Sequence, residues 1–190
     1  QGARVGTSSL RRGAQLQAVR PDLRIESIRG NIDTRLRKLE EEGLDAILLA
    51  AAGLHRMGWQ DRITSYLPVE ICLPAVGQGA LAIECRADDA EVLKLLALLH
   101  DPSSARTVAA ERRLLGMLNG GCQVPIGAYA SLDGESPEGP MTLTGMVASQ
   151  DGKKLLKASA SGTDPKSLGE HVARQLLEAG ADAILAEVRE

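Results

Sequence analysis

Hydrophobic positions in the first seventy residues follow two alternating spacings. Short apolar runs typical of buried strands are separated by stretches in which apolar residues recur every three or four positions, as in helices. The runs cover 3–7, 23–28 and 44–50, and the helical stretches cover 8–20 and 31–43. Strands and helices in this order predict a parallel α/β sheet, with ligands expected at the carboxyl ends of its strands.

Polar residues mark the ends of the two predicted helices. Thr7 or Ser8 is expected to cap the first helix, because a side-chain oxygen at that position accepts a hydrogen bond from a free backbone N–H. Asn31 is expected to open the second helix, and Gly43 to end it. Both helices would therefore begin directly after a strand.

The pattern of residues that interrupt helices and strands changes between residues 67 and 86, where prolines and glycines surround the apolar segments. This change predicts a crossover between two domains. Beyond it, a strand is expected at 80–85, helices at 88–100, 101–119 and 164–180, and strands at 123–132, 141–149 and 153–161. Asp101 and Pro102 are expected to open the middle helix.

These elements predict an α/β class protein built from two domains. We expect a periplasmic-binding-protein-like α/β domain at 1–75 and a crossover segment at 76–100. A small α+β domain with a three-stranded antiparallel sheet is expected at 101–190.

Composition narrows the class of protein. Hydrophobic residues make up 44% of the chain, but aromatic residues only 2%, and Phe is absent. No apolar run approaches the roughly 20 residues of a membrane span, and the first residues do not resemble a signal peptide, so a cytoplasmic location is expected. The three cysteines form no CxxC pair, which favours neither a disulfide framework nor a metal site. Cys72 and Cys85 are interpreted as small buried hydrophobic residues.

Positive charge is concentrated near the N-terminus. Residues 1–40 contain eight Arg and one Lys against four acidic residues, although the whole chain carries a net charge of −3. Arginine is suited to bidentate binding of carboxylate or phosphate. A nucleic-acid binder is disfavoured, because the surplus is local and the aromatic residues that stack on bases are scarce.

Arginines follow each of the three predicted parallel strands. Arg11 and Arg12 fall in the first turn of a helix, where free backbone N–H groups already favour anions. Arg29 and Arg35 flank the second helix start, and Arg56 follows the third strand beside His55, which is interpreted as a structural side chain. Either these arginines are separate solvated charges, or they converge on one anion site at the edge of the sheet.

Cys122 lies just past a predicted helix C-terminus, between two glycines and the sequence QVP. A helix C-terminus does not favour a thiolate, so a redox or protease role is disfavoured. A thiol there can still serve as a covalent attachment point for an electrophilic partner. Such a partner would require a polar, anion-binding cleft nearby.

Several segments together resemble the porphobilinogen deaminase (hydroxymethylbilane synthase) family. They are VGTSSLRR, SIRGN, TRLRKL, AILLAAAGLHRMG, LPAVGQGALAIECR and GGCQVPIGAY, in this order from Val5 onward. The resemblance implies a dipyrromethane cofactor held through a thioether bond to Cys122. It also implies cofactor binding by Ser9, Arg11, Arg12 and Arg29 and substrate binding by Arg35, Arg56 and Gln78.

The resemblance further implies a transferase that condenses four porphobilinogen units head to tail, with loss of ammonia, to give hydroxymethylbilane. Its partners would be porphobilinogen and the growing chain, without nucleic acid, membrane or metal, and the parent enzyme would be a monomer. The family's catalytic aspartate lies upstream of the residues matched here. We therefore expect a fragment that lacks most of an N-terminal domain and is inactive alone, with 76–100 returning to that missing domain. A non-catalytic, anion-binding module of periplasmic-binding-protein type is the alternative.

Overall fold

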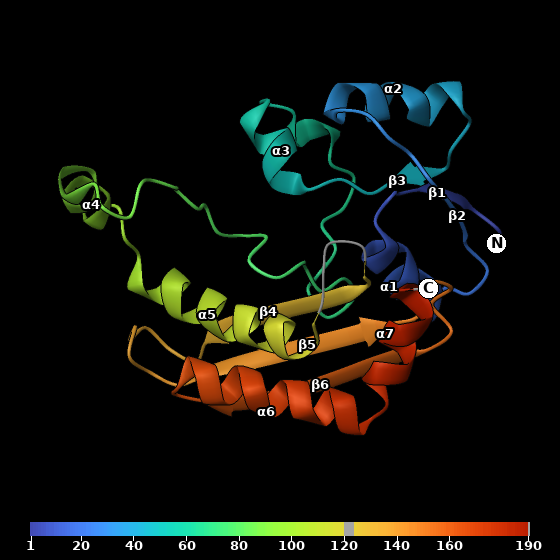
Figure 1. Cartoon of the computed structure of the whole chain (residues 1–190). Coiled ribbons are helices and arrows are strands. Elements are labelled where there is room, and N and C mark those ends of the chain that lie inside the picture. The colour runs from blue at the N-terminus through green and yellow to red at the C-terminus, as the bar shows by residue number, and fades with distance from the viewer. Residues whose placement is uncertain (120–123, 190) are drawn as a thin grey trace.

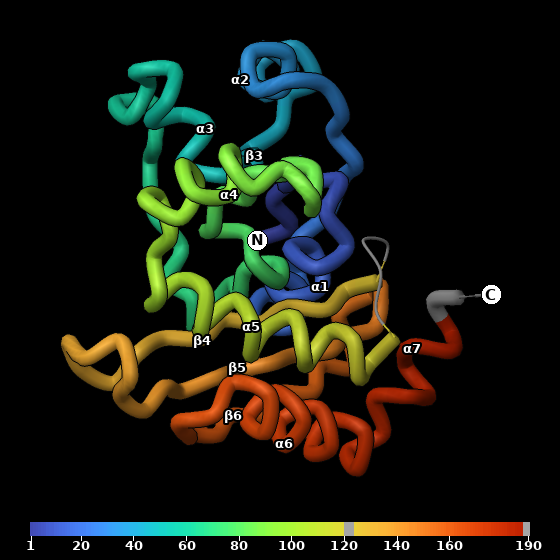
Figure 2. Tube along the Cα trace, turned by 60° about the vertical axis from the view of Figure 1, so that its left-hand side comes forward, coloured from blue at the N-terminus to red at the C-terminus, as the bar shows by residue number. Residues whose placement is uncertain are grey.

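The computed structural model of the chain describes residues 1–119 and 124–189, with side chains described to Glu187. Two three-stranded sheets organise these residues (Figure 1). Helix α1 lies between the two sheets in both Figure 1 and Figure 2. None of the described helices combines the length and the apolar character that a membrane span needs.

The N-terminal sheet is parallel, as the alternating pattern predicts. Its strand order is β2-β1-β3, and Val5 in the central strand pairs with both Ile25 and Ala46. The elements are β1 (Arg4–Gly6), α1 (Leu10–Val19), β2 (Arg24–Glu26), α2 (Ile32–Glu41), β3 (Ala46–Ile47), α3 (Ala51–Arg56) and the 3-10 helix η1 (Gln60–Arg62). The prediction of a parallel α/β sheet is confirmed, although the strands are shorter than predicted.

A polar side chain caps the N-terminus of α1 and of α2, the helices that follow β1 and β2 in the sequence. The cap of α1 is Ser9, whose Oγ accepts from the backbone N–H of Arg12 at 3.4 Å. The expectation of Thr7 or Ser8 was wrong, because the helix begins at Leu10 and Thr7 Oγ1 accepts from Ser9 N instead of from an N–H inside the helix. Asn31 caps α2 as predicted, accepting from Thr34 N at 2.8 Å, and Gly43 follows with a φ of 61°.

The second sheet is antiparallel, with strand order β4-β5-β6. It is formed by β4 (Ile126–Leu132), β5 (Met141–Ala148) and β6 (Leu155–Gly162) and is accompanied by α5 (Pro102–Met117), α6 (Pro165–Glu178) and α7 (Ala181–Arg189). Helices α5 and α6 cover one face of this sheet (Figure 1). Leu143 and Val147 of β5 are fully buried against them, in a core with Leu114 and Leu176. The predicted three-stranded sheet is confirmed, whereas α7 was not predicted.

The opposite face of the antiparallel sheet contacts α1. Met146 and Ala148 of β5 form a small buried cluster with Ala14 of α1 and Leu73. The turn after β5 approaches the same helix so closely that a Cβ on Gly152 would lie 2.6 Å from the carbonyl oxygen of Ala14. Helix α1 therefore joins the two sheets.

The segment between the sheets differs most from the prediction. Residues 80–85 form no strand, and Leu81 and Ile83 are 82% and 60% exposed. The prediction was wrong because no described strand pairs with this apolar run. The interpretation of Cys85 as buried was also wrong, since it is exposed, and Cys72 is only half-buried. Helix α4 (Ala90–Ala97) follows within the predicted range and projects from the body of the molecule (Figure 1).

Candidate functional site

The N-terminus of α1 carries two arginines in its first turn. Ser9 caps the helix, and its own backbone N–H donates to Thr7 Oγ1 at 3.2 Å. Arg11 and Arg12 follow immediately, and no acidic residue shares this first turn. Because the free N–H groups of a helix N-terminus carry partial positive charge, two cations here add to a field that attracts anions.

Arg11 points into the molecule. Its side chain is buried, with 7% of the residue exposed, and one Nη donates to the carbonyl oxygen of Leu73. The other Nη donates to Gln78 Oε1 at 3.1 Å. Burial lowers the pKa of the Arg11 guanidinium below its ordinary value, and the charge of Arg12 lowers it further. A guanidinium stays protonated even so, and two of its five N–H donors account for these bonds.

Arg12 lies closer to the surface and to the parallel sheet. One Nη donates at 3.3 Å to the carbonyl oxygen of Leu48, which directly follows β3. Burial is the main cause that lowers the pKa of Arg12, and the positive charge of Arg35 adds to it. Arg35 belongs to the first turn of α2, where its Nε donates to Gly30 O at 2.7 Å. The Arg12 guanidinium therefore lies just past the carboxyl end of β3, within electrostatic reach of Arg35 at the start of α2.

Of the remaining predicted residues, Gln78 contacts Arg11, whereas Arg29 and Arg56 lie on separate segments. Arg29 is exposed in the turn after β2, and Arg56 is exposed in the last turn of α3. Gln78 is exposed at the end of the segment that follows Leu73, and its Oε1 also accepts from Ala75 N at 3.0 Å. Cys122 lies outside the described residues. His55 Nε2 is hydrogen-bonded to the Tyr66 hydroxyl at 2.6 Å, in keeping with a structural role.

The predicted site arginines lack a carboxylate partner, as do five others among the described residues, namely Arg24, Arg62, Arg106, Arg112 and Arg174. Among the described residues, no Asp or Glu oxygen lies within ion-pair distance of Arg11, Arg12, Arg29, Arg35 or Arg56. In contrast, Arg4 pairs with Glu26 at 2.6 Å and Arg20 with Asp22 at 2.7 Å. The site therefore offers cationic donors that the described chain does not neutralise.

Two residues of the site were not predicted as functional. Gln15 is 1% exposed, lies one turn after Arg11 and is hydrogen-bonded to both backbone groups of Leu73. Cys72 Sγ lies 3.9 Å from Gln15 Nε2 and within electrostatic reach of Arg11 and Arg12. In the sequence, the only indication that Gln15 belongs to the site was its spacing from Arg11, because residues four apart lie on the same face of a helix.

The segment that carries Gln78 is also held by contacts with α5 and β4. Glu111 of α5 is 6% exposed and accepts from Gly77 N at 2.7 Å and from Ala130 N at 2.9 Å. Pro74 O accepts from Ala128 N in β4 at 3.1 Å. The segment from residue 73 to residue 78 is therefore held between α1 and the antiparallel sheet. No cluster of three or more metal-ligating side chains occurs in the described part of the chain.

Comparison with known proteins gives consistent matches along the chain. Residues 1–94 match the family model described as "Porphobilinogen deaminase, dipyromethane cofactor binding domain", and residues 105–178 match "Porphobilinogen deaminase, C-terminal domain". Two curated relatives, both named porphobilinogen deaminase, come from Brevibacillus brevis and Paenibacillus macerans. They are 61% and 58% identical to the chain, over 99% and 95% of its length. The chain spans about 60% of the length of each relative.

Proposed function

Because the chain belongs to the porphobilinogen deaminase family, we propose that it forms part of a transferase of tetrapyrrole biosynthesis. The reaction is the head-to-tail condensation of four porphobilinogen units, with loss of ammonia, to give hydroxymethylbilane. The arginine cluster without carboxylate partners carries this proposal. Each porphobilinogen unit bears an acetate and a propionate, and arginine binds such carboxylates with paired, charge-assisted hydrogen bonds.

The donors present fit a dipyrromethane cofactor bearing the same carboxylates. We assign Ser9, Arg11, Arg12 and Arg29 to the cofactor, and Arg35, Arg56 and Gln78 to the incoming substrate. Cys122 would hold the cofactor through a thioether. When bound, this group would supply the terminal pyrrole on which the chain is built. Support comes from Pro125, which follows Cys122 by three residues in the sequence. Pro125 is buried, and its carbonyl oxygen accepts from Ala148 N at 3.0 Å. Ala148 belongs to the buried cluster that includes Ala14 of α1.

The role of this chain would be to bind and orient the reacting units. The guanidinium groups would neutralise carboxylates that otherwise repel one another, and fixed contacts would hold each unit in register for the next bond. General acid and base catalysis would belong to an aspartate outside the 190 residues. We therefore propose that this chain alone binds porphobilinogen without turning it over. Formation of hydroxymethylbilane by the isolated chain would contradict this part of the proposal.

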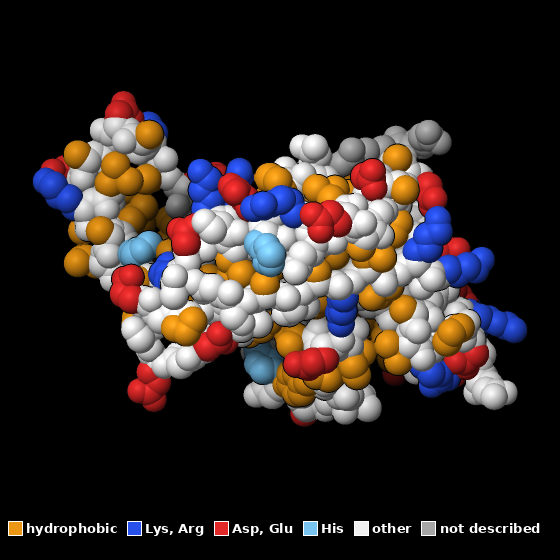
Figure 3. Space-filling model, turned by 90° about the horizontal axis from the view of Figure 1, so that it is seen from below, with side chains coloured by type: hydrophobic (Ala, Val, Ile, Leu, Met, Phe, Trp, Pro, Cys, Tyr) orange, Lys and Arg blue, Asp and Glu red, His pale blue; other side chains and the backbone are white. Residues whose placement is uncertain are grey.

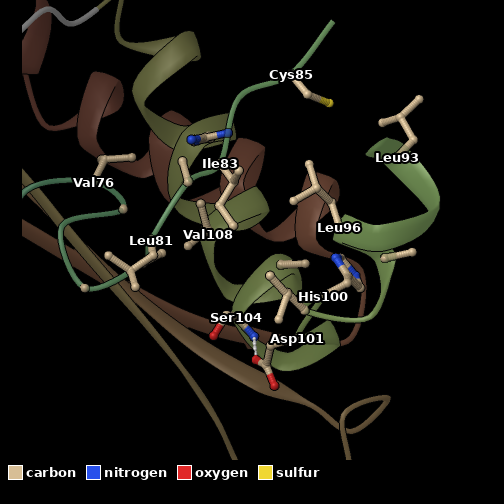
Figure 4. A pocket seen from close by; sticks show the side chains of 18 residues that line it. Val76, Leu81, Ile83, Cys85, Leu93, Leu96, His100, Asp101, Ser104 and Val108 are labelled. Carbon is tan, nitrogen blue, oxygen red and sulfur yellow. Dashed lines mark hydrogen bonds between the residues drawn. The ribbon is translucent and has the colours of Figure 1, made fainter. Parts of the chain in front are cut away.

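Residues 76–100 expose apolar side chains, which supports the proposal that another domain packs against them. The groove between the segment after Val76, α4 and the start of α5 is lined by Leu81, Ile83, Leu93 and Leu96 (Figure 4). Leu98, just after α4, is 82% exposed, and hydrophobic side chains gather on the lobe at the left of Figure 3, where α4 lies. We propose that the N-terminal domain of the parent enzyme covers this face, because contiguous apolar surface of this kind marks an interface.

Three finer predictions belong to the same proposal. The periplasmic-binding-protein-like architecture of residues 1–75 is supported by the parallel order β2-β1-β3 with arginines at the carboxyl ends. The division at 76–100 and 101–190 is supported by the two separate sheets. A monomeric parent enzyme in the cytoplasm completes the proposal.

Intact mass after denaturation tests the covalent site. The chain is incubated with hydroxymethylbilane, and we expect a mass increase equal to hydroxymethylbilane minus one water, because the bond from the cysteine sulfur to the hydroxymethyl carbon replaces the hydroxyl group, which leaves with the thiol proton. Cys122→Ser should abolish this adduct, whereas Cys85→Ser, which removes an exposed thiol, should retain it. An adduct that survives in Cys122→Ser would refute the assignment of this residue. A chain that gains no mass and binds no porphobilinogen in calorimetry would refute the proposed function.

A further inference from the structure

The buried side-chain carboxamide of Gln15 forms hydrogen bonds with both backbone groups of Leu73. Its Oε1 accepts from the N–H of Leu73 at 2.8 Å, and its Nε2 donates to the carbonyl oxygen of the same residue at 3.1 Å. Gln15 is 1% exposed and Leu73 is 2% exposed, so water does not readily replace either bond. The carboxamide thus pairs with Leu73 as a neighbouring strand would.

The Leu73 carbonyl that Gln15 holds is also the acceptor for Arg11. Both side chains project from the same face of α1, because they lie four residues apart. Gln15 Nε2 lies 3.2 Å from Arg11 O, which ties the carboxamide to the turn that carries Arg11. The direction of the Arg11 guanidinium is therefore set by a carbonyl whose own position depends on Gln15.

The second acceptor of Arg11 depends on the same segment. Gln78 Oε1, at 3.1 Å from Arg11 Nη, comes five residues after Leu73. Between them, Pro74 O accepts from β4, and Gly77 N donates to Glu111. On the α1 side, Gln15 holds this segment together with Arg11 and the packing of Ala14 against Leu73. The other contacts attach it to the antiparallel sheet and to α5. Loss of Gln15 would remove both hydrogen bonds to the backbone of Leu73, so that Arg11 would donate to an acceptor that is held less firmly.

We propose that Gln15 is a positioning residue for anion binding: it fixes the Leu73 carbonyl and thereby the direction of the Arg11 guanidinium. This inference rests on the proposed function, in which Arg11 binds a carboxylate of the cofactor. Gln15 itself does not contact the ligand. Preorganised donors bind more tightly, because less side-chain freedom is lost on binding.

The first experiment needs no ligand. Nitrogen-detected NMR of the arginine side chains compares the wild-type chain with Gln15→Met, which keeps the length of the side chain but removes both polar atoms. We expect the Arg11 guanidinium to rotate faster and its N–H protons to exchange faster in Gln15→Met, while Arg12 is little changed. Gln17→Met, on the same helix, is the matched control and should leave both arginines unchanged. Arg11 signals that are identical in wild type and Gln15→Met would overturn the inference.

A second variant covers the case in which Gln15→Met does not fold. Gln15→Glu keeps an acceptor for the N–H of Leu73 but replaces the donor to Leu73 O by a carboxylate oxygen. The guanidinium of Arg11 should turn from the Leu73 carbonyl toward this carboxylate, with a large shift of its N–H resonances. An Arg11 spectrum unaffected by Gln15→Glu would also overturn the inference.

Calorimetric titration with porphobilinogen then tests the consequence for binding. Gln15→Met should weaken binding, and its effect should largely vanish in an Arg11→Gln background but persist in an Arg12→Gln background. We expect the two effects to be non-additive by roughly threefold to tenfold in affinity for the Arg11 pair. Additive effects for Gln15 and Arg11, in a chain that binds porphobilinogen, would overturn the inference and leave the proposed function standing. If the wild-type chain bound no porphobilinogen, the proposed function would fail, and the NMR comparison would still decide the role of Gln15.

Discussion

Glu111 offers a test of how the segment beneath the site is held. Its carboxylate is buried in α5 and accepts from the N–H groups of Gly77 and Ala130 at 2.7 and 2.9 Å. No carboxylate-to-cation contact of Glu111 occurs within ion-pair distance among the described residues. Burial therefore raises the pKa of Glu111 above its ordinary value of 4.5, although the two N–H donors oppose the shift.

The magnitude of the loss follows from the two hydrogen bonds. Glu111→Ala leaves two N–H groups without their acceptor, and each buried polar group without a partner costs about 1–3 kcal/mol. The bond from Ala130 is fully buried, whereas that from Gly77 is only partly so. We expect Glu111→Ala to lower the free energy of unfolding by about 2–4 kcal/mol at pH 4. Glu111→Gln, which keeps one acceptor oxygen, should lower it by less.

The pH dependence has a defined sign. Since the pKa of Glu111 is higher in the folded chain than in the unfolded chain, its contribution to stability is fully present below the unfolded value, near 4.5. That contribution is lost as the pH rises through the raised folded value. The stability difference between wild type and Glu111→Ala should therefore shrink as the pH increases from 4 to 8. The difference between wild type and Glu111→Gln should shrink by the same amount, because both variants remove the same titrating group.

Urea unfolding followed by circular dichroism at pH 4 to 8 measures these differences. Glu178→Gln, an exposed carboxylate on α6, is the matched control and should show neither the loss nor the pH dependence. A wild-type advantage over Glu111→Ala that stays constant or grows with pH would refute the reasoning from the buried carboxylate. Different pH slopes for the two Glu111 variants would refute it as well.

Glycine packing, charge and exposed apolar surface each give a further expectation. Gly169→Ala should lower the free energy of unfolding by about 1–3 kcal/mol, because its Cβ would lie 2.6 Å from the carbonyl oxygen of Ala110. Gly116→Ala, with open space around its Cβ, should raise it by up to about 1 kcal/mol, and equal effects in urea unfolding would contradict this packing. Arg12→Gln should weaken porphobilinogen binding by roughly tenfold or more in calorimetry, whereas exposed Arg174→Gln should not. Leu98→Ser should weaken the association of the chain with the separately produced N-terminal domain in analytical ultracentrifugation, and an unchanged association constant would contradict an interface there.

The antiparallel half of the fold was predictable because its signals are local. Asp101 and Asp164 each cap a helix that begins with proline, as the sequence predicts for Asp101. The strands alternate between faces, so that the odd-numbered residues of β5 meet the helices while Met146 meets α1 and Leu73. The predicted order of three strands needed no knowledge of distant contacts.

The run at 80–85 shows where such patterns fail. Its apolar residues favour a strand, but a strand also needs a neighbour with which to form backbone hydrogen bonds. In the described chain this run has no such neighbour, and its side chains are exposed. Apolar composition alone therefore does not predict a strand, because it carries no information about the pairing partner.

The site was predictable only in part for the same reason. The convergence of Arg12 and Arg35 follows from strand ends in a parallel sheet, which the sequence pattern does indicate. The inward turn of Arg11 depends on Leu73, which is 62 residues away along the chain. No local spacing predicts such a contact, because it arises from the path of residues 73–78 between α1 and the antiparallel sheet.

Burial without a carboxylate partner distinguishes Arg11 from the other arginines of the described residues. Arg4, Arg20 and Arg113 are held by carboxylates and so have less to offer an anionic ligand. At the start of α1, burial is the main cause that lowers the pKa of Arg11 and of Arg12. The charge of Arg12 lowers the pKa of Arg11 further and that of Arg35 lowers the pKa of Arg12, whereas Cys72 opposes both shifts, beside a helix N-terminus that already disfavours cations. This arrangement is unfavourable in the free chain, and a bound carboxylate relieves it. The free energy that a bound carboxylate would recover by neutralising these charges supports the proposal that the arginines bind an anionic ligand.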